Sequence, residues 1–183
     1  MSLAAASRVS ERAVARVVAL GASNLTRGFQ TVVSTARAAW GPGVEVLAAL
    51  GHGRSYGARS QLVFRTLPGI LDSGLWPELE SRSPAATRAL VTDVGNDILY
   101  GFSAERTLAW VEEALRRLSR VTHDIVVTDL PLASIRRLSN RVSTVESLRL
   151  YLMRSERRWV FGVEQFTPQS GVTLRSGGRV WLY

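Results

Sequence analysis

Three short polar segments, each preceded by an apolar run, carry the residues best suited to chemistry. They read Gly-Ala-Ser-Asn at 21–24, Gly-His-Gly-Arg-Ser-Tyr-Gly at 51–57 and Asp-Val-Gly-Asn-Asp at 93–97. The first places Ser23 after a predicted buried strand and just before a predicted helix, a position that suits a nucleophile. The second offers backbone N–H groups, and the third offers the side-chain amide of Asn96. Together these groups would provide a nucleophile and donors for a developing oxyanion.

The apolar runs that must position these segments are 14–20, 44–50 and 88–94, and a fourth follows at 124–130. We predict that all four are strands. Helical patterns lie between or after them at 29–40, from about 60, after a capping Ser103, and from about 134 into the region of 154. This alternation predicts a doubly wound α/β fold, with a parallel sheet covered by helices on both faces. Since the carboxyl ends of parallel strands meet at one edge, the three polar segments should converge there.

The rest of the chain is less regular. We expect 71–84 to be irregular and 1–13 to be a flexible leader, and we interpret 172–174 and 179–183 as strands around a Ser-Gly-Gly turn. With 183 residues and no repeat or linker, the chain is predicted to form a single domain.

Composition narrows the classes of function. The chain has no cysteine, which excludes disulfides, thiolate metal sites and a cysteine nucleophile. All 23 basic residues are arginine and the net charge is +8, but the arginines are spread along the chain, so we expect no nucleic-acid partner. No apolar run approaches transmembrane length, and 1–15 lack the apolar core of a signal peptide. We therefore expect no membrane association and a cytoplasmic location.

The three polar segments, in this order along the chain, resemble blocks of the SGNH, or GDSL-like, hydrolase family over about 17–131. The resemblance implies that Ser23 is the nucleophile, within Gly-Ala-Ser-Asn where the family has Gly-Asp-Ser-Leu. It implies Gly53 as an oxyanion donor, with Gly51 as the other candidate, and Asn96 as the second donor in Val-Gly-Asn-Asp. It also implies a flavodoxin-like order of about five strands.

The fourth block of that family, an Asp-x-x-His that supplies the base and its partner, does not occur in this sequence. We expect the chain to be a C-terminally truncated piece of a longer hydrolase, because the helix that should follow the block is missing too. His52 could reach the site from the glycine loop, although such a histidine is more often a surface residue. His123 begins a strand and so belongs to the far edge of the sheet. The chain is therefore predicted to turn over esters poorly.

Each segment also has a purely structural interpretation. Ser23 and Asn24 are favoured helix N-caps, the glycines of 51–57 suit a tight turn, and Asn96 with Asp97 suits a turn between strand and helix.

Two rival motifs share the second segment. Residues 53–57 fit the Gly-x-Ser-x-Gly nucleophile elbow, with Ser55 as its serine. The spacing of the glycines in 51–57 also approaches the dinucleotide-binding fingerprint, but it is one residue too long. A helix that starts after these glycines could still hold a phosphate at its N-terminus.

The function that we predict is serine-dependent hydrolysis of a small ester through an acyl-enzyme, inactive in this chain if the histidine is lacking. The alternatives are a non-catalytic SGNH-like module that binds a ligand, and a nucleotide- or phosphate-binding domain that uses the 51–57 loop. We expect no metal or organic cofactor. The sequence does not indicate the oligomeric state.

Overall fold

A six-stranded parallel sheet forms the centre of the protein. The computed structural model describes residues 15–62, 65–128, 160–162 and 180–182. The strands of the sheet are β1 (Ala15–Leu20), β2 (Glu45–Ala49), β5 (Ala86–Val91), β6 (Ile125–Thr128), β7 (Val160–Gly162) and β8 (Val180–Leu182). Their order across the sheet is β7-β6-β5-β1-β2-β8, and every neighbouring pair is parallel. The predicted doubly wound α/β fold and its flavodoxin-like order are confirmed, with short strands β7 and β8 at the two edges.

The centre of the sheet is buried on both faces, as parallel sheets require. All residues of β1 and β2 are buried. Along β1, Val17 and Ala19 face one layer of helix, whereas Val18 and Leu20 face the other. The alternation of side chains in a strand therefore divides one apolar run between two cores.

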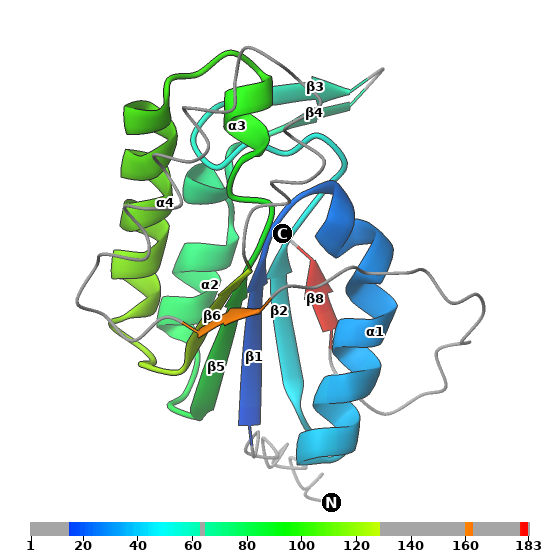
Figure 1. The fold of residues 1–183 in the computed structure, drawn as a ribbon. Coiled ribbons are helices and arrows are strands. Elements are labelled where there is room, and N and C mark those ends of the chain that lie inside the picture. Colours follow the sequence, from blue (N-terminus) through cyan, green and yellow to red (C-terminus); the bar gives the residue numbers. More distant parts are fainter. Residues whose placement is uncertain (1–14, 63–64, 129–159, 163–179, 183) are drawn as a thin grey trace, which may run out of the picture.

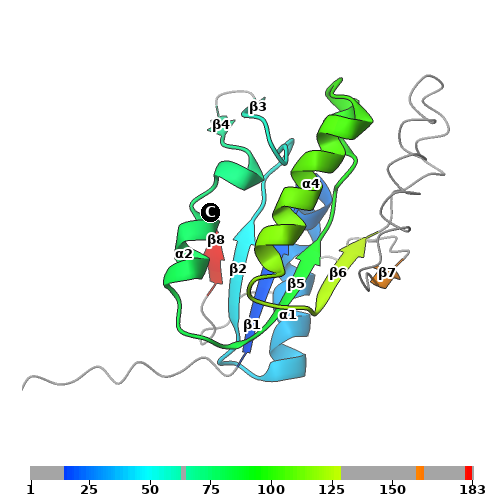
Figure 2. The same cartoon turned by 90° about the vertical axis from the view of Figure 1, so that its left-hand side faces the viewer.

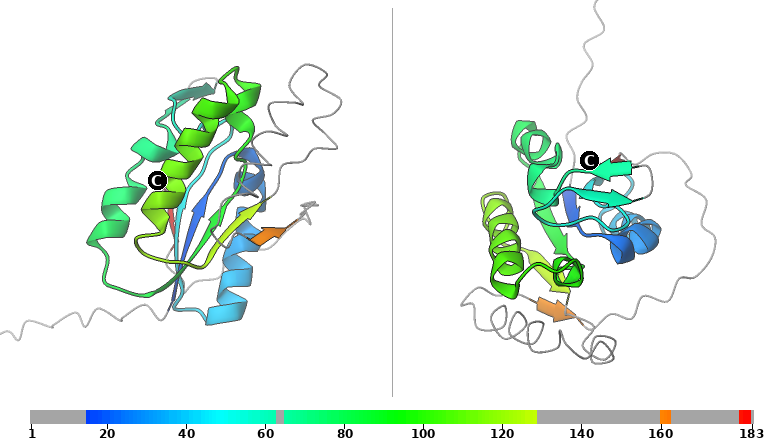
Figure 3. Two further views of the ribbon diagram at one scale, coloured as in Figure 1. Left: turned by 60° about the vertical axis from the view of Figure 1, so that its left-hand side comes forward. Right: turned by 90° about the horizontal axis from the view of Figure 1, so that it is seen from above.

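Helices cover both faces. One face carries α1 (Ser23–Trp40), whose buried side chains include Leu25, Val33 and Ala36. The opposite face carries α2 (Leu75–Ser81) and α4 (Ala104–Leu118), which share one large apolar cluster with β1, β2, β5 and β6. Figure 1 and the view from above in Figure 3 show the sheet between these two layers.

An antiparallel hairpin and a short helix lie beyond the carboxyl ends of the strands, at the top of Figure 1. The antiparallel hairpin of β3 (Ser60–Leu62) and β4 (Arg65–Leu67) follows the 51–57 loop. The four-residue helix α3 (Asn96–Leu99) follows β5, and the 3₁₀ turn η1 (Ile70–Asp72) precedes α2. In Figure 2 the hairpin stands above α2 and β2.

Several predicted elements are corrected by the structure. The helix expected from about Ser60 is wrong, because a strand begins there. The stretch 71–84, expected to be irregular, contains α2. The third strand ends at Val91, before the expected 94, and α1 begins at Ser23, six residues before the expected start at Phe29. The cap at Ser103 is confirmed, since its hydroxyl accepts a hydrogen bond from the Arg106 N–H at 3.2 Å.

Other expectations lie outside the described residues: the leader at 1–13, the long helix from 134 and the strand at 172–174. The strand predicted at 179–183 is present as β8, and β7 was not predicted. Within the described part of the chain, no helix has both the length and the apolar character needed to cross a membrane.

Candidate active site

Ser23 lies at the topological switch point of the sheet. The chain passes from β1 to β2 on one side and later returns to β5 on the other side of β1, so the switch point lies between the carboxyl ends of β1 and β5, the place where open α/β sheets usually bind ligands. The two ends pack closely, because a Cβ on Gly21 would lie only 2.6 Å from a methyl carbon of Thr92. Ser23 follows Gly21 by two residues, is half-buried and is the first residue of α1.

The second polar segment reaches the Ser23 hydroxyl through Gly53. The Gly53 N–H donates a hydrogen bond to Ser23 Oγ at 3.2 Å. Gly53 has a φ of +68°, a left-handed conformation that glycine adopts without the strain that a side chain would cause. Gly51 instead uses its carbonyl to accept the Arg54 N–H. Of the two glycines, Gly53 is therefore the one whose N–H contacts the serine in the described structure.

Asn96 stands at the same edge of the sheet. It begins α3, its backbone N–H donates to the Asp93 carbonyl at 3.1 Å, and its side chain is half-buried. Within the described residues, no protein group is hydrogen-bonded to its side-chain amide. A ligand at this edge can therefore use the Asn96 amide as a donor.

Asp93 links the third segment to the first. Its carboxylate accepts hydrogen bonds from the Ala22 N–H at 2.7 Å, the Leu25 N–H at 3.2 Å and the Asn24 amide at 2.7 Å. The structural interpretation of Ser23 and Asn24 as helix caps is therefore wrong: one contacts Gly53 and the other contacts Asp93. Sequence reasoning gave Asp93 no role, although it stands in the singled-out segment 93–97.

Asp97 links the third segment to the second. It is fully buried and accepts the Tyr56 N–H at 2.9 Å. Burial raises the pKa of its carboxyl, and hydrogen bonds from Ser55 and Tyr56 oppose that rise. Asp97 thus fixes the glycine loop to the end of β5, which goes beyond the simple turn that sequence reasoning suggested.

Two tyrosines lie in this region. Tyr56 is buried and donates its hydroxyl to the Thr92 carbonyl at 2.7 Å, and burial raises its pKa well above the ordinary value. Tyr100 is half-exposed, and its hydroxyl would lie 3.3 Å from a Cβ built on Gly53. Burial, and then the charges of Asp97 and Asp93, raise the pKa of Tyr100 as well. Both phenols therefore stay protonated near neutral pH.

The rival serine, Ser55, has a structural environment. It is buried, and its oxygen accepts the N–H groups of Gly57 at 3.2 Å and Ala58 at 2.8 Å. A hairpin follows it instead of a helix, so the strand–turn–helix context of a nucleophile elbow is not present. The helix N-terminus on which the phosphate-binding interpretation of this loop relied is missing for the same reason.

Among the described residues, neither histidine side chain is hydrogen-bonded to Ser23. His52 is exposed in the glycine loop, and no described residue is hydrogen-bonded to its side chain. His123 lies two residues before β6, at the opposite end of the sheet, as expected. No group of three potential ligands from His, Cys, Asp and Glu occurs among the described residues.

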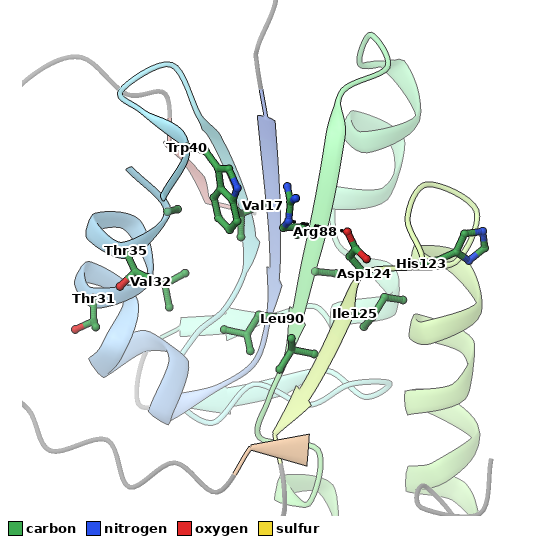
Figure 4. Close-up of a pocket in the computed structure, with 13 residues that line it drawn as sticks. Val17, Thr31, Val32, Thr35, Trp40, Arg88, Leu90, His123, Asp124 and Ile125 are labelled. Carbon is green, nitrogen blue, oxygen red and sulfur yellow. Dashed lines mark ion pairs between the residues drawn. The ribbon is translucent and has the colours of Figure 1, made fainter. Parts of the chain in front are cut away.

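A hollow of about 730 Å³ lies away from the three polar segments, between α1 and β6. Figure 4 shows apolar side chains such as Val32 and Leu90 in its walls, with Trp40, Arg88 and Asp124 toward one end. None of Ser23, Gly53 and Asn96 lines it. It is the part of the sheet face that α1 leaves uncovered.

The comparisons with known proteins found no match: no family model matches the chain, and neither the curated proteins nor the solved structures include a significant relative.

Proposed function

We propose that this chain carries the acyl-transfer site of a serine-dependent ester hydrolase of the SGNH type. The observation that carries the proposal is the hydrogen bond from the Gly53 N–H to Ser23 Oγ, which joins residues thirty positions apart at the switch point. An N–H at this distance from a nucleophilic oxygen is also close to the place where a carbonyl oxygen would become negative during attack.

The chemistry follows from these groups. Ser23 Oγ attacks the ester carbonyl, the Ser23 proton passes to a base, and the alcohol leaves with a proton to give an acyl-serine and then, with water, the acid. The N–H groups of Ser23 and Gly53 and the Asn96 amide stabilise the oxyanion. Exposed Tyr100, whose hydroxyl lies close to Gly53, offers surface to a small acyl or alcohol group.

The base is the missing part, because neither histidine is hydrogen-bonded to Ser23. We therefore expect the chain to hydrolyse short p-nitrophenyl esters slowly, since oxyanion stabilisation and binding retain only about 10³-fold over water without a complete triad. The cytoplasmic location belongs to the same proposal.

Imidazole in solution tests this proposal, because it can act as the base. We expect it to raise p-nitrophenyl acetate hydrolysis by the wild type well above the rate that imidazole gives with Ser23→Ala. Ser34→Ala, an exposed serine of the same helix, is the matched control and should behave like wild type. Equal rates for wild type and Ser23→Ala with imidazole would contradict the proposal. Fast turnover without imidazole would instead point to His52 as a base.

The Asn96 donor is tested in the same assay. Asn96→Ala should lower the imidazole-supported kcat by about 10²- to 10³-fold with a smaller effect on KM, the usual loss for one oxyanion donor. Ser55→Ala should retain the Ser23-dependent reaction. A loss of activity in a folded Ser55→Ala protein, with Ser23→Ala active, would move the nucleophile to the second segment.

A further inference from the structure

The Asp93 carboxylate accepts hydrogen bonds from residues on both sides of Ser23, the candidate nucleophile. One of its carboxylate oxygens, Oδ2, accepts the N–H groups of Ala22 and Leu25, and the other, Oδ1, accepts the Asn24 side-chain amide. These partners come immediately before and after Ser23. The backbone at Ser23 is thus held from both sides by one side chain that lies about seventy residues further along the sequence.

These bonds replace the usual start of a helix. Ala22 is the N-cap of α1 and has no side chain that could cap it. In a capping box, the side chains of the N-cap and of the third helical residue satisfy each other's backbone N–H. Here Ala22 and Leu25 occupy those two positions, and the single carboxylate of Asp93 accepts both N–H groups. Its negative charge also suits a helix N-terminus.

The backbone of Asp93 is itself in an unusual conformation. Its φ is +60°, and no other non-glycine residue among those described has a positive φ. Such a conformation costs free energy and persists where the surrounding contacts hold it. This turn directs the carboxylate of Asp93 across the switch point toward α1.

We propose that Asp93 is a positioning residue, which holds the Ser23 turn so that Oγ keeps its place beside the Gly53 N–H. The proposal rests on the proposed function. A carboxylate that merely stabilised α1 would affect the folding equilibrium and leave the reactivity of the folded protein unchanged. A positioning residue also changes that reactivity, because a displacement of about 1 Å can cost 10²-fold in rate.

The composition of the chain, its tryptic peptides and the choice of substitution make the effect of Asp93 on Ser23 measurable. The chain has no lysine and no cysteine, so p-nitrophenyl acetate finds few competing nucleophiles. Trypsin releases Ser23 in the peptide 17–27. Asp93→Gly removes the carboxylate and relieves the positive φ at once, so any loss is due to the missing carboxylate and not to backbone strain.

The experiment measures the rate at which Ser23 becomes acetylated, at a temperature where circular dichroism shows each variant folded. We expect Asp93→Gly to lower the maximal rate about 10²-fold while the half-saturating ester concentration stays unchanged. Asp93→Asn should recover most of that rate, since its amide oxygen can accept both backbone N–H groups while its NH₂ donates to a flipped Asn24 amide. Asn also tolerates a positive φ. Asp124→Gly, at the opposite end of the sheet, is the matched control and should react like wild type.

The outcomes distinguish a failure of the positioning role of Asp93 from a failure of the proposed function of Ser23. Equal acetylation rates in folded wild type and Asp93→Gly would overturn the positioning role and leave Ser23 as the nucleophile. A rate in Asp93→Asn as low as in Asp93→Gly would overturn the hydrogen-bonding account and assign the effect to charge. A wild-type protein whose Ser23 is never acetylated would remove the proposed function, and this inference with it.

Discussion

At the scale of single residues, the candidate site depends on two buried or half-buried carboxylates that join its three segments. Asp93 joins the third segment to the first, and Asp97 joins the third to the second. Neither could be assigned these roles from the sequence, because most of their partners are backbone N–H groups, which nearly every residue possesses. Ser23, Gly53 and Asn96 could be singled out because each follows a predicted strand, and the carboxyl ends of parallel strands meet at one edge of the sheet.

The pKa of Asp97 provides a test at this scale. Burial raises it from the ordinary value of 3.8, so the folded protein holds this proton more tightly than the unfolded chain. The contribution of Asp97 to the free energy of unfolding is therefore most favourable at low pH, and it declines as the pH rises from about 3.8 through the raised pKa. The amide introduced by Asp97→Asn cannot titrate, so the stability of wild type relative to this variant should fall over the same pH range in urea titrations. A difference that does not change with pH would contradict the assignment.

At the scale of elements, the sequence predicted the four central strands and the helix after Ser103, where apolar periodicity and a local cap agree. It placed the start of α1 too late because the cap comes from Asp93 and leaves no local signal. It missed α2, which contains Pro77, a residue type that is disfavoured in the interior of a helix. Pro77 is the third residue of α2, where a backbone N–H has no partner within the helix and its loss costs little.

The packing of α4 against the glycine loop can be tested by a substitution at Gly57. A Cβ on Gly57 would lie 2.1 Å from the Trp110 ring of α4, so Gly57→Ala must displace the loop or the helix. We expect a loss of about 1–3 kcal/mol in the free energy of unfolding, as for other overpacked sites. Gly43→Ala is the control, because a Cβ there meets nothing within 4 Å and its φ is not positive. Equal stability of the two variants in urea would contradict the packing described here.

At the scale of the whole molecule, the two ends of the sheet have different tasks. The carboxyl ends of the strands carry the candidate site, whereas the opposite end holds a buried ion-pair network. There Glu45 pairs with Arg16 at 2.9 Å and with Arg82 at 3.0 Å. Arg16 is only 4% exposed and also donates to the Ser83 carbonyl.

This division predicts that stability and reactivity can be changed separately. Glu45→Ala leaves the buried Arg16 without a carboxylate, and we expect it to cost about 3–5 kcal/mol of stability. The rate of Ser23 acetylation in the folded variant should equal that of wild type. Thermal unfolding and the rate of Ser23 acetylation, measured on the same sample of Glu45→Ala, test whether stability falls while reactivity is kept. A large fall in acetylation of folded Glu45→Ala would show that the two ends are coupled.

The central claim is that Ser23 is the nucleophile of this molecule, and the most direct measurement locates the acetyl group after reaction with p-nitrophenyl acetate. Trypsin places Ser23 in the peptide 17–27 and Ser55 in the peptide 55–59, so mass spectrometry separates the two candidates. The account predicts one acetyl group on 17–27, located at Ser23, faster with imidazole and absent in Ser23→Ala. Acetylation of 55–59 that survives Ser23→Ala, with 17–27 unmodified, would contradict it.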